Sequence, residues 1–366
     1  MRTFKIGHGT FLLLMAQVVS SHAQTASDTW TFIDAARDDR EIPVQFFYPN
    51  DAVAPMPWVI IAHGFAMSTT DYDDLAQALV AGGFVVGLVN TETGFAPSHE
   101  AYGLDLAYLA EHGGADLALV DIEVGNWMQP GTVALVGHSM GGGAAWLAAS
   151  MTEVDALVGL APAETTPSAI EAGPSIEAPA MVISGTADAV TPPTTQHIPL
   201  YEALTHVDCQ AFVSLEEGGH CGFADEGTLC DFGELLFTGM DRETQQLHTH
   251  SMLIPWLQFQ LGLNPDGLDA IEAYADNDGD VELTLACETS SLAPGEAVEN
   301  PALLFPNPVS ATLNLGGATQ DWRAWNAQGQ AMPIPREGRV DVSTWPNGPY
   351  LFQSGDLQPT RVLVTH

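Results

Sequence analysis

The pentapeptide Gly-His-Ser-Met-Gly at residues 137–141 constrains this chain more than any other stretch. The apolar run Val133–Val136 leads into it, and small residues that suit a helix follow it. A sharp turn from a strand into a helix holds its central residue in a strained conformation and exposes that side chain above the sheet. Glycines two residues to either side let the strand and the helix approach closely. The pattern is typical of a nucleophile elbow and predicts a reactive serine at Ser139.

Apolar strands and helical patterns alternate along most of the chain. Two antiparallel strands are expected between Thr29 and Tyr48, around a turn at 37–40. Further strands are expected at 58–62, 84–89, 133–136, 156–161, 180–184 and 211–215, and helices at 72–80, from 97 to about 109, and at 252–261. Strands separated by such helical patterns form βαβ units. We therefore expect an α/β fold of the α/β-hydrolase type, with a mostly parallel central sheet, over residues 24–268.

Two later strand ends carry candidate partners for the serine. In this fold an acid and a base follow the serine in chain order, at the carboxyl edge of the sheet. Asp188 follows the strand at 180–184, and His220 follows the strand at 211–215. The residue types predict His220 as general base, Asp188 as the group that fixes its tautomer, and Ser139 as nucleophile. His248 and His250 follow the right strand but lie before the closing helix and not on the strand-end loop, so they are less favoured. Asp208 is also less favoured, because it precedes the last strand instead of following the strand before it.

Two backbone N–H groups are expected to form the oxyanion hole. In this fold one comes from the residue after the nucleophile, here Met140. The other comes from the loop after the strand at 58–62, where Phe65 follows His63-Gly64. His63 is expected to brace that loop, and His138 to pack beside the site. Neither metal nor cofactor is expected to take part.

Four cysteines lie between residues 209 and 287. Three pairings are possible in an oxidising compartment. Cys221 and Cys230 flank one short loop, so that bridge is favoured and leaves Cys209 with Cys287. A structural zinc site is less favoured, because the paired C-x-x-C spacing is missing.

The N-terminus and the charge both predict an exported protein. Two basic residues, an apolar run over 11–19 and Ser21-His22-Ala23 are typical of a signal peptide spanning residues 1–23. The remaining chain would carry seven arginines and no lysine against 46 acidic residues. Such a surface excludes phosphate capture and nucleic-acid binding. An acidic surface suited to saline water is favoured over a patch for a cationic partner, and we expect a secreted monomer.

The composition changes beyond residue 268. Residues 269–300 are expected to form an acidic linker. The stretch Asp276–Asp280 resembles the start of a calcium loop, but Val281 stands where that loop needs glycine, so an acidic turn is favoured. Residues 301–366 contain short strands broken by Pro and Gly, which predicts a small all-β sandwich-like domain.

The motifs resemble those of the bacterial cutinases and polyester hydrolases, including the poly(ethylene terephthalate) hydrolases. The resemblance covers most of residues 28–262. It implies that Phe65 and Met140 line one wall of the acyl site and Val190 the other. Ala163 stands where many polyester hydrolases have a tryptophan that stacks on an aromatic ring, so Phe95 and Trp146 become candidates for that surface. The matching stretches are His63–Phe65, 137–143, 184–188 with 190–193, 219–224 and 255–257.

The C-terminal segment resembles a type IX secretion sorting domain. The matching stretches are 305–309, 325–330 and 341–350. The resemblance implies export across an outer membrane by the type IX secretion machinery as a partner. An appended β-module that binds polymer is the alternative.

Three functions remain in view. The leading hypothesis is a secreted serine carboxylester hydrolase that acts through an acyl-enzyme on polymeric or small hydrophobic esters. A lipase or a feruloyl-type small-ester esterase is the alternative within the same chemistry. A non-catalytic surface binding protein with a hydrolase fold is the alternative of another class, and the three candidate catalytic residues argue against it.

Overall fold

The computed structural model describes residues 25–50, 55–118, 123–226, 229–234 and 239–287, together with short stretches between 304 and 364. The chain divides into two compact units, Met1–Glu288 and Thr289–His366. The expected signal peptide, residues 1–23, lies outside the described residues.

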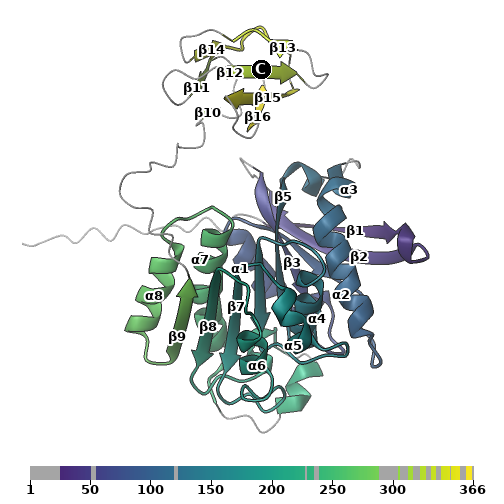
Figure 1. The fold of residues 1–366 in the computed structure, drawn as a ribbon, viewed down its shortest axis with the longest axis vertical. Coiled ribbons are helices and arrows are strands. Elements are labelled where there is room, and N and C mark those ends of the chain that lie inside the picture. Colours follow the sequence, from purple (N-terminus) through teal and green to yellow (C-terminus); the bar gives the residue numbers. More distant parts are fainter. Residues whose placement is uncertain are drawn as a thin grey trace, which may run out of the picture. The chain divides into compact units, whose positions relative to one another are not determined.

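A nine-stranded sheet organises the first unit (Figure 1). Its order is β1-β2-β4-β3-β5-β6-β7-β8-β9. The six central strands, β4, β3, β5, β6, β7 and β8, are parallel to one another. Strands β1 and β2 at one edge and β9 at the other are antiparallel to their neighbours. The expected α/β fold with a mostly parallel sheet is confirmed. The strands are β1 (Thr25–Asp34), β2 (Arg40–Pro49), β3 (Met56–Ala62), β4 (Val85–Val89), β5 (Met128–His138), β6 (Ala156–Leu160), β7 (Ala180–Gly185), β8 (Cys209–Leu215) and β9 (Val281–Cys287).

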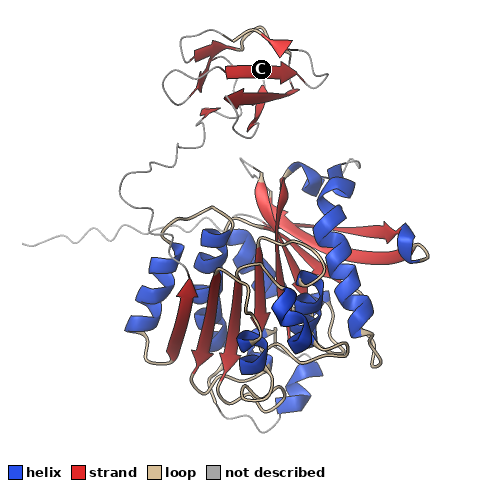
Figure 2. Cartoon of the chain, in the orientation of Figure 1, coloured by secondary structure: helices blue, strands red, loops and turns tan. Residues whose placement is uncertain are grey.

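Helices cover both faces of this sheet (Figure 2). The central strands are apolar on both sides: in β3, Trp58 and Ile60 join one core cluster, and Val59 and Ile61 join the other. One cluster includes residues of α2 (His99–Tyr108), α3 (Gly114–Ala118), α4 (Met140–Ala149), α5 (Ala169–Ala172) and α6 (His197–Glu202). The opposite cluster includes residues of α1 (Asp73–Ala81), α7 (Arg242–Gln260) and α8 (Gly267–Asn277). The central strands are therefore buried on both faces, as is typical of a parallel sheet between two layers of helices.

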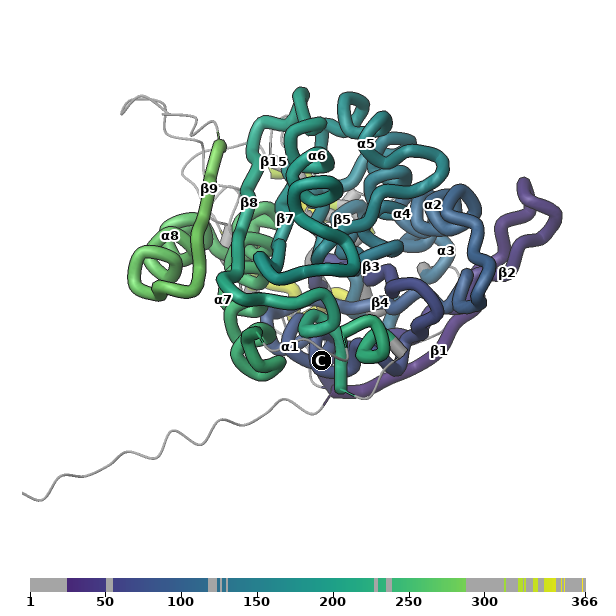
Figure 3. The backbone as a smooth tube through the Cα atoms, turned by 90° about the horizontal axis from the view of Figure 1, so that it is seen from below, coloured from purple at the N-terminus to yellow at the C-terminus, as the bar shows by residue number. Residues whose placement is uncertain are grey.

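The expected end of the catalytic domain at residue 268 is wrong, because residues 269–287 of the expected linker belong to the first unit, whereas the rest of that stretch, 288–300, lies outside the described residues. Helix α8 packs on α7, and β9 pairs antiparallel with β8 at the sheet edge. Figure 3 shows α8 and β9 together at one side of the sheet, with the β1–β2 hairpin at the other. Only one face of β9 is covered, so its buried and exposed residues alternate, as is typical of an edge strand. The disulfide Cys209–Cys287 joins the two strands, as predicted.

The second unit contains two small antiparallel sheets. One has the order β10-β11-β14, and the other β13-β12-β15-β16. Side chains of both sheets, including Leu313 and Phe352, share one buried cluster, which is the arrangement of a sandwich. Its strands are β10 (Leu304–Phe305), β11 (Thr312–Leu315), β12 (Trp322–Asn326), β13 (Ala331–Met332), β14 (Arg339–Asp341), β15 (Gly348–Ser354) and β16 (Thr360–Val364). Parts of the three stretches that suggested a sorting domain, such as 306–309 and 327–330, lie outside the described residues. Among the helices that are described, none combines the length and the apolar character needed to cross a membrane.

Candidate active site

Ser139 occupies the turn between β5 and α4. Its φ is 53° and its ψ is −121°, a conformation that an L-residue adopts only under constraint. A Cβ added at Gly137 would lie 2.2 Å from the carbonyl oxygen of Gly141, and one added at Gly141 would lie 2.2 Å from that of Ala62. Only glycine fits both positions, so the strand and the helix can meet and leave the serine at the turn.

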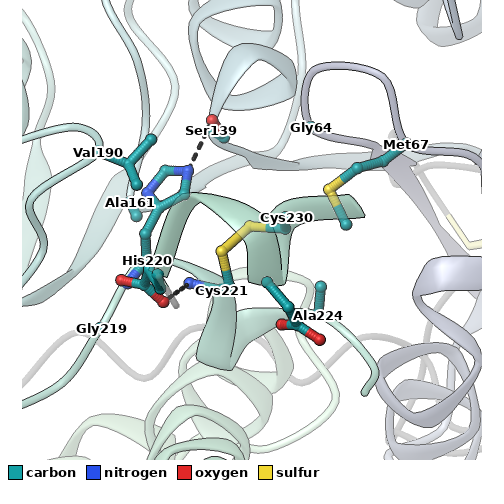
Figure 4. The surroundings of a disulfide bond; sticks show 12 residues. Gly64, Met67, Ser139, Ala161, Val190, Gly219, His220, Cys221, Ala224 and Cys230 are labelled. Carbon is teal, nitrogen blue, oxygen red and sulfur yellow. Dashed lines mark hydrogen bonds between the residues drawn. A yellow bond between two sulfur atoms is a disulfide. The ribbon is translucent and has the colours of Figure 1, made fainter. Parts of the chain in front are cut away.

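Ser139, His220 and Asp188 form one continuous line of hydrogen bonds. His220 Nε2 lies 2.9 Å from Ser139 Oγ, and His220 Nδ1 lies 2.7 Å from Asp188 Oδ2. All three side chains are buried. In Figure 4 the imidazole of His220 points to Ser139, with Val190 to one side. The structure therefore brings together the three residues that the strand ends predicted, at distances suited to proton transfer.

The carboxylate of Asp188 is held by its own turn. Its Oδ1 accepts the N–H groups of Val190 and Thr191, both at 2.8 Å. Its Oδ2 accepts the hydroxyl of Thr191 at 2.9 Å in addition to the ring of His220. Burial alone would raise the pKa of Asp188, but the hydrogen bonds from His220 and Thr191 outweigh it and lower that pKa. Asp188 therefore stays ionised beside the imidazole.

A second buried histidine lies behind this carboxylate. His197, at the start of α6, is fully buried, with Nδ1 2.7 Å from Ser184 Oγ and Nε2 3.0 Å from Thr191 Oγ1. Burial lowers the pKa of His197 to about 4, although Asp188 lies 3.6 Å away. A neutral His197 fixes the Thr191 hydroxyl and does not compete with His220 for the negative charge of Asp188.

His138 connects the elbow to the loop of His220. Burial, with a smaller contribution from the neighbouring His220, lowers the pKa of His138 to about 3, so the ring is neutral. Its Nε2–H donates to the carbonyl oxygen of His220 at 3.0 Å, which leaves Nδ1 to accept the hydroxyl of Tyr72 at 2.8 Å. His138 therefore packs beside the site, as predicted, and holds the main chain of the base.

Two buried tyrosines fix the loop after β3. The N–H of His63 donates to the Tyr102 hydroxyl at 2.7 Å, and the N–H of Gly64 donates to the Tyr72 hydroxyl at 2.8 Å. The His63 ring lies between the carbonyl oxygens of Gly64 and Thr91, as a brace would. Within the described chain, neither the N–H of Phe65 nor that of Met140 has an acceptor. The two amides expected to form the oxyanion hole are thus unoccupied donors.

The residues expected to line the substrate site differ in how far they are buried. Met140 is buried at the first position of α4. The N–H of Ala163 donates to the Ser139 carbonyl at 2.8 Å, so Ala163 lies directly beside the elbow. Phe65 and Val190 are exposed, at 49% and 42% of their surface.

Of the two aromatic residues considered as replacements for a tryptophan at position 163, Trp146 is fully buried in the core and offers no surface. Phe95 is 78% exposed, and its ring packs edge-on against Phe65 with centroids 6.3 Å apart. An exposed aromatic pair therefore forms between the loop after β3, which carries Phe65, and the loop after β4, which carries Phe95, and Phe95 alone remains a candidate for that surface.

Among the residues that the structure describes, one group outside the site has the residue types and spacing to hold a metal ion. Ligand atoms of His248, Asp278 and Asp280 all lie within 4.8 Å of one another. His248 Nδ1 is 2.8 Å from the Tyr274 hydroxyl and 3.6 Å from Asp278 Oδ2, and its buried Nε2 has no hydrogen-bond partner among the described residues. His248 and His250 lie on α7, away from the strand end that carries His220.

Sequence reasoning missed the residues that position the site. These are Tyr72, Tyr102, Thr191 and His197, together with Glu234, whose carboxylate accepts the N–H groups of His220 and Cys221. Only Thr191 left a signal, because a threonine three residues after an aspartate is typical of a side-chain turn. The others left no such signal, because their partners lie beyond the reach of a local turn, 6 residues away for His197 and Thr191 and 39 residues away for Tyr102 and His63.

A strained serine after the central strand, followed in chain order by an aspartate and a histidine that line up with it, defines an α/β-hydrolase with a Ser-His-Asp arrangement. A family model described as PET hydrolase-like matches residues 43–242, just over half of the chain, and the chain belongs to this family of ester hydrolases. All three residues of the arrangement fall within the matched range. No curated protein matches the chain.

Proposed function

We propose that this chain is a secreted serine carboxylester hydrolase of the cutinase and polyester hydrolase type. The observation that carries the proposal is the unbroken line from Ser139 Oγ through His220 to Asp188, at 2.9 and 2.7 Å. A serine in this setting is activated by an adjacent general base, and the base is oriented by a third group.

The reaction proceeds through an acyl-enzyme. His220 Nε2 takes the proton of Ser139 as the serine oxygen attacks the ester carbonyl carbon. The negative charge that develops on the carbonyl oxygen is stabilised by the N–H groups of Phe65 and Met140. Asp188 stabilises the imidazolium, and His220 then gives its proton to the leaving alcohol. Water repeats the sequence on the acyl-enzyme, with His220 as base, and releases the carboxylic acid.

The surroundings of the elbow support hydrophobic esters as substrates. Phe65, Phe95 and Val190 expose apolar side chains to solvent, as a site that meets an extended or insoluble ester would need. Ala163 contributes no ring beside the elbow, and a stacked ring adds about 1 kcal/mol beyond burial. This favours a second candidate within the same chemistry, a lipase or feruloyl-type esterase that acts on small or aliphatic esters.

Export is part of the proposal. The basic and apolar N-terminal pattern over residues 1–23 supports a signal peptide, and the two disulfides support an oxidising compartment. The motifs of residues 301–366 and the all-β second unit support delivery by the type IX secretion machinery. We expect a monomer.

The test is a substrate panel on the exported protein. We expect turnover of p-nitrophenyl esters that varies with acyl length, and release of monomers from aliphatic polyester film. The Ser139→Ala variant should fold normally and lose turnover, because the change removes a nucleophile and almost no core volume. Activity on triglyceride or feruloyl esters without release from any film would select the second candidate. Turnover retained by Ser139→Ala would reject the proposed nucleophile.

A further inference from the structure

His220 is held by its main chain as well as by its ring. Its N–H donates to Oε1 of Glu234 at 2.5 Å, and the next N–H, of Cys221, donates to Oε2 of the same carboxylate at 2.8 Å. The carbonyl oxygen of His220 accepts a hydrogen bond from His138 Nε2–H at 3.0 Å. The peptide groups on both sides of the imidazole are therefore fixed by separate parts of the fold.

Glu234 reaches His220 from the end of a short segment with its own anchors. This segment is the 3-10 helix η7 (Leu229–Glu234), and the disulfide Cys221–Cys230 ties it to the residue after His220. Figure 4 shows the disulfide beside His220. A Cβ added at Gly233 would lie 3.4 Å from Val190, so the segment also borders the wall of the site.

Arg242 secures the same segment from the start of α7. Its Nη1 donates to the carbonyl oxygens of Cys221 and Asp225 at 2.7 and 2.8 Å, and also to that of Ala224. Its Nη2 pairs with Asp231 at 2.5 Å. The side chain of Glu234 is thus presented to His220 by a segment that is anchored at both a disulfide and an ion pair.

The chemistry of Glu234 matches this use. A carboxylate offers two acceptor oxygens, so it can take two neighbouring N–H groups at once, and hydrogen bonds to an ionised acceptor are the stronger kind. A glutamine at the same place would accept one N–H and turn its own NH₂ group against the other. The requirement is therefore for an acid and not merely for a polar side chain.

We propose that Glu234 is a positioning residue for the general base: by binding two consecutive amides, it holds the backbone of His220 so that Nε2 stays within reach of Ser139. The inference rests on the proposed function. Displacement of a catalytic group by about 1 Å can cost a hundredfold in rate. Loss of Glu234 should therefore lower kcat far more than it changes KM.

The test compares Glu234→Gln with Glu243→Gln, which makes the same chemical change at an exposed position in the first turn of α7. Active sites are titrated with an organophosphonate, and kcat on p-nitrophenyl butyrate is expressed per titrated site. We expect a fall of roughly tenfold to a hundredfold in kcat for Glu234→Gln with KM within about twofold, and no change for Glu243→Gln. A purely structural role would lower the melting temperature and the titrated fraction but leave kcat per site intact, and that result would overturn the inference.

A readout without turnover separates this inference from the proposed function. With ¹⁵N-labelled histidine, the backbone amide resonance of His220, assigned through His220→Asn, should move upfield and exchange faster in Glu234→Gln, because the charged acceptor is weakened. Glu243→Gln should leave it in place. If the wild-type protein had no esterase activity but the resonance responded in this way, the proposed function would fail and the positioning of His220 would stand. A resonance unchanged in Glu234→Gln would refute the positioning itself.

Discussion

The acid and the base of this site are held in different ways. Asp188 takes its main-chain and hydroxyl partners from Val190 and Thr191, two and three residues further along the chain. The peptide groups of His220 are bound by Glu234 and His138, which are 14 and 82 residues away in sequence. A local turn therefore suffices to place the acid, whereas the base depends on tertiary structure on both sides.

Of the changes that test this comparison, a substitution of the acid, Asp188, should have the largest effect on kcat. Asp188→Asn should lower kcat by roughly 10³–10⁴-fold, because an amide cannot stabilise the imidazolium and favours the wrong tautomer of His220. The measurement is steady-state hydrolysis of p-nitrophenyl butyrate. Asp269→Asn, which changes an exposed aspartate of α8, should leave turnover unchanged. A loss of less than tenfold in Asp188→Asn would contradict the assignment of the acid.

The two disulfides should separate stability from activity. In the chain-entropy account, loss of Cys209–Cys287, with a sequence separation of 78, costs about 4–5 kcal/mol, and loss of Cys221–Cys230, with a separation of 9, costs about 2–3 kcal/mol. Double Cys→Ser variants are compared by denaturant unfolding and by kcat at a temperature where both remain folded. The short bridge should have the smaller effect on stability and the larger effect on kcat, because only it adjoins His220. A larger loss of kcat on removal of Cys209–Cys287 would argue that tertiary contacts of the Cys221–Cys230 loop do not position His220.

Acid should destabilise the protein through its neutral buried histidines. The folded pKa of His197 is depressed to about 4, so between that value and its ordinary 6.5 the unfolded state binds more protons. Stability should therefore be complete above about pH 6.5 and fall as the pH is lowered, by on the order of 2 kcal/mol for His197 at pH 5. Chemical unfolding at pH 7 and pH 5 measures the slope. His197→Asn should flatten it, and His112→Asn, at an exposed position, should not. Equal slopes in all three proteins would show that His197 does not titrate in this way.

Thr191→Val tests how much of the acid-side geometry depends on one hydroxyl. Thr191 Oγ1 lies 2.9 Å from Asp188 Oδ2, 3.0 Å from His197 Nε2 and 2.9 Å from His220 Nδ1. Valine keeps the volume and removes the hydroxyl, so we expect a fall of about tenfold in kcat, the smallest of these effects on the site. The two backbone N–H bonds to Asp188 remain. An exposed neighbour, Thr195→Val, serves as the matched control. If kcat were unchanged, the backbone turn alone would hold the acid.

Local patterns explain what the sequence could predict. Ser139, Asp188 and His220 each follow an apolar strand directly, so strand order and the rule that parallel strands end at one edge were enough to bring them together. Cys221 and Cys230 paired as their spacing suggested. Strand β9 was missed although its residues alternate between a covered and an exposed face, because it follows the acidic turn 276–280 and was interpreted as part of a linker. Tyr72, Tyr102 and Glu234 were missed because a tyrosine or glutamate gives no sign of the loop that it contacts, whether that loop is 8 residues away, as for Tyr72 and Gly64, or 39, as for Tyr102 and His63.

The central claim is that Ser139 is a nucleophile activated by His220 and Asp188. Intact-mass analysis of the exported protein after treatment with a fluorophosphonate tests it most directly. We predict one adduct per chain, mapped to the peptide that contains Ser139, formed in step with loss of ester turnover and absent from Ser139→Ala. A protein that carries no adduct and hydrolyses no ester, or one labelled equally well in Ser139→Ala, would contradict the account.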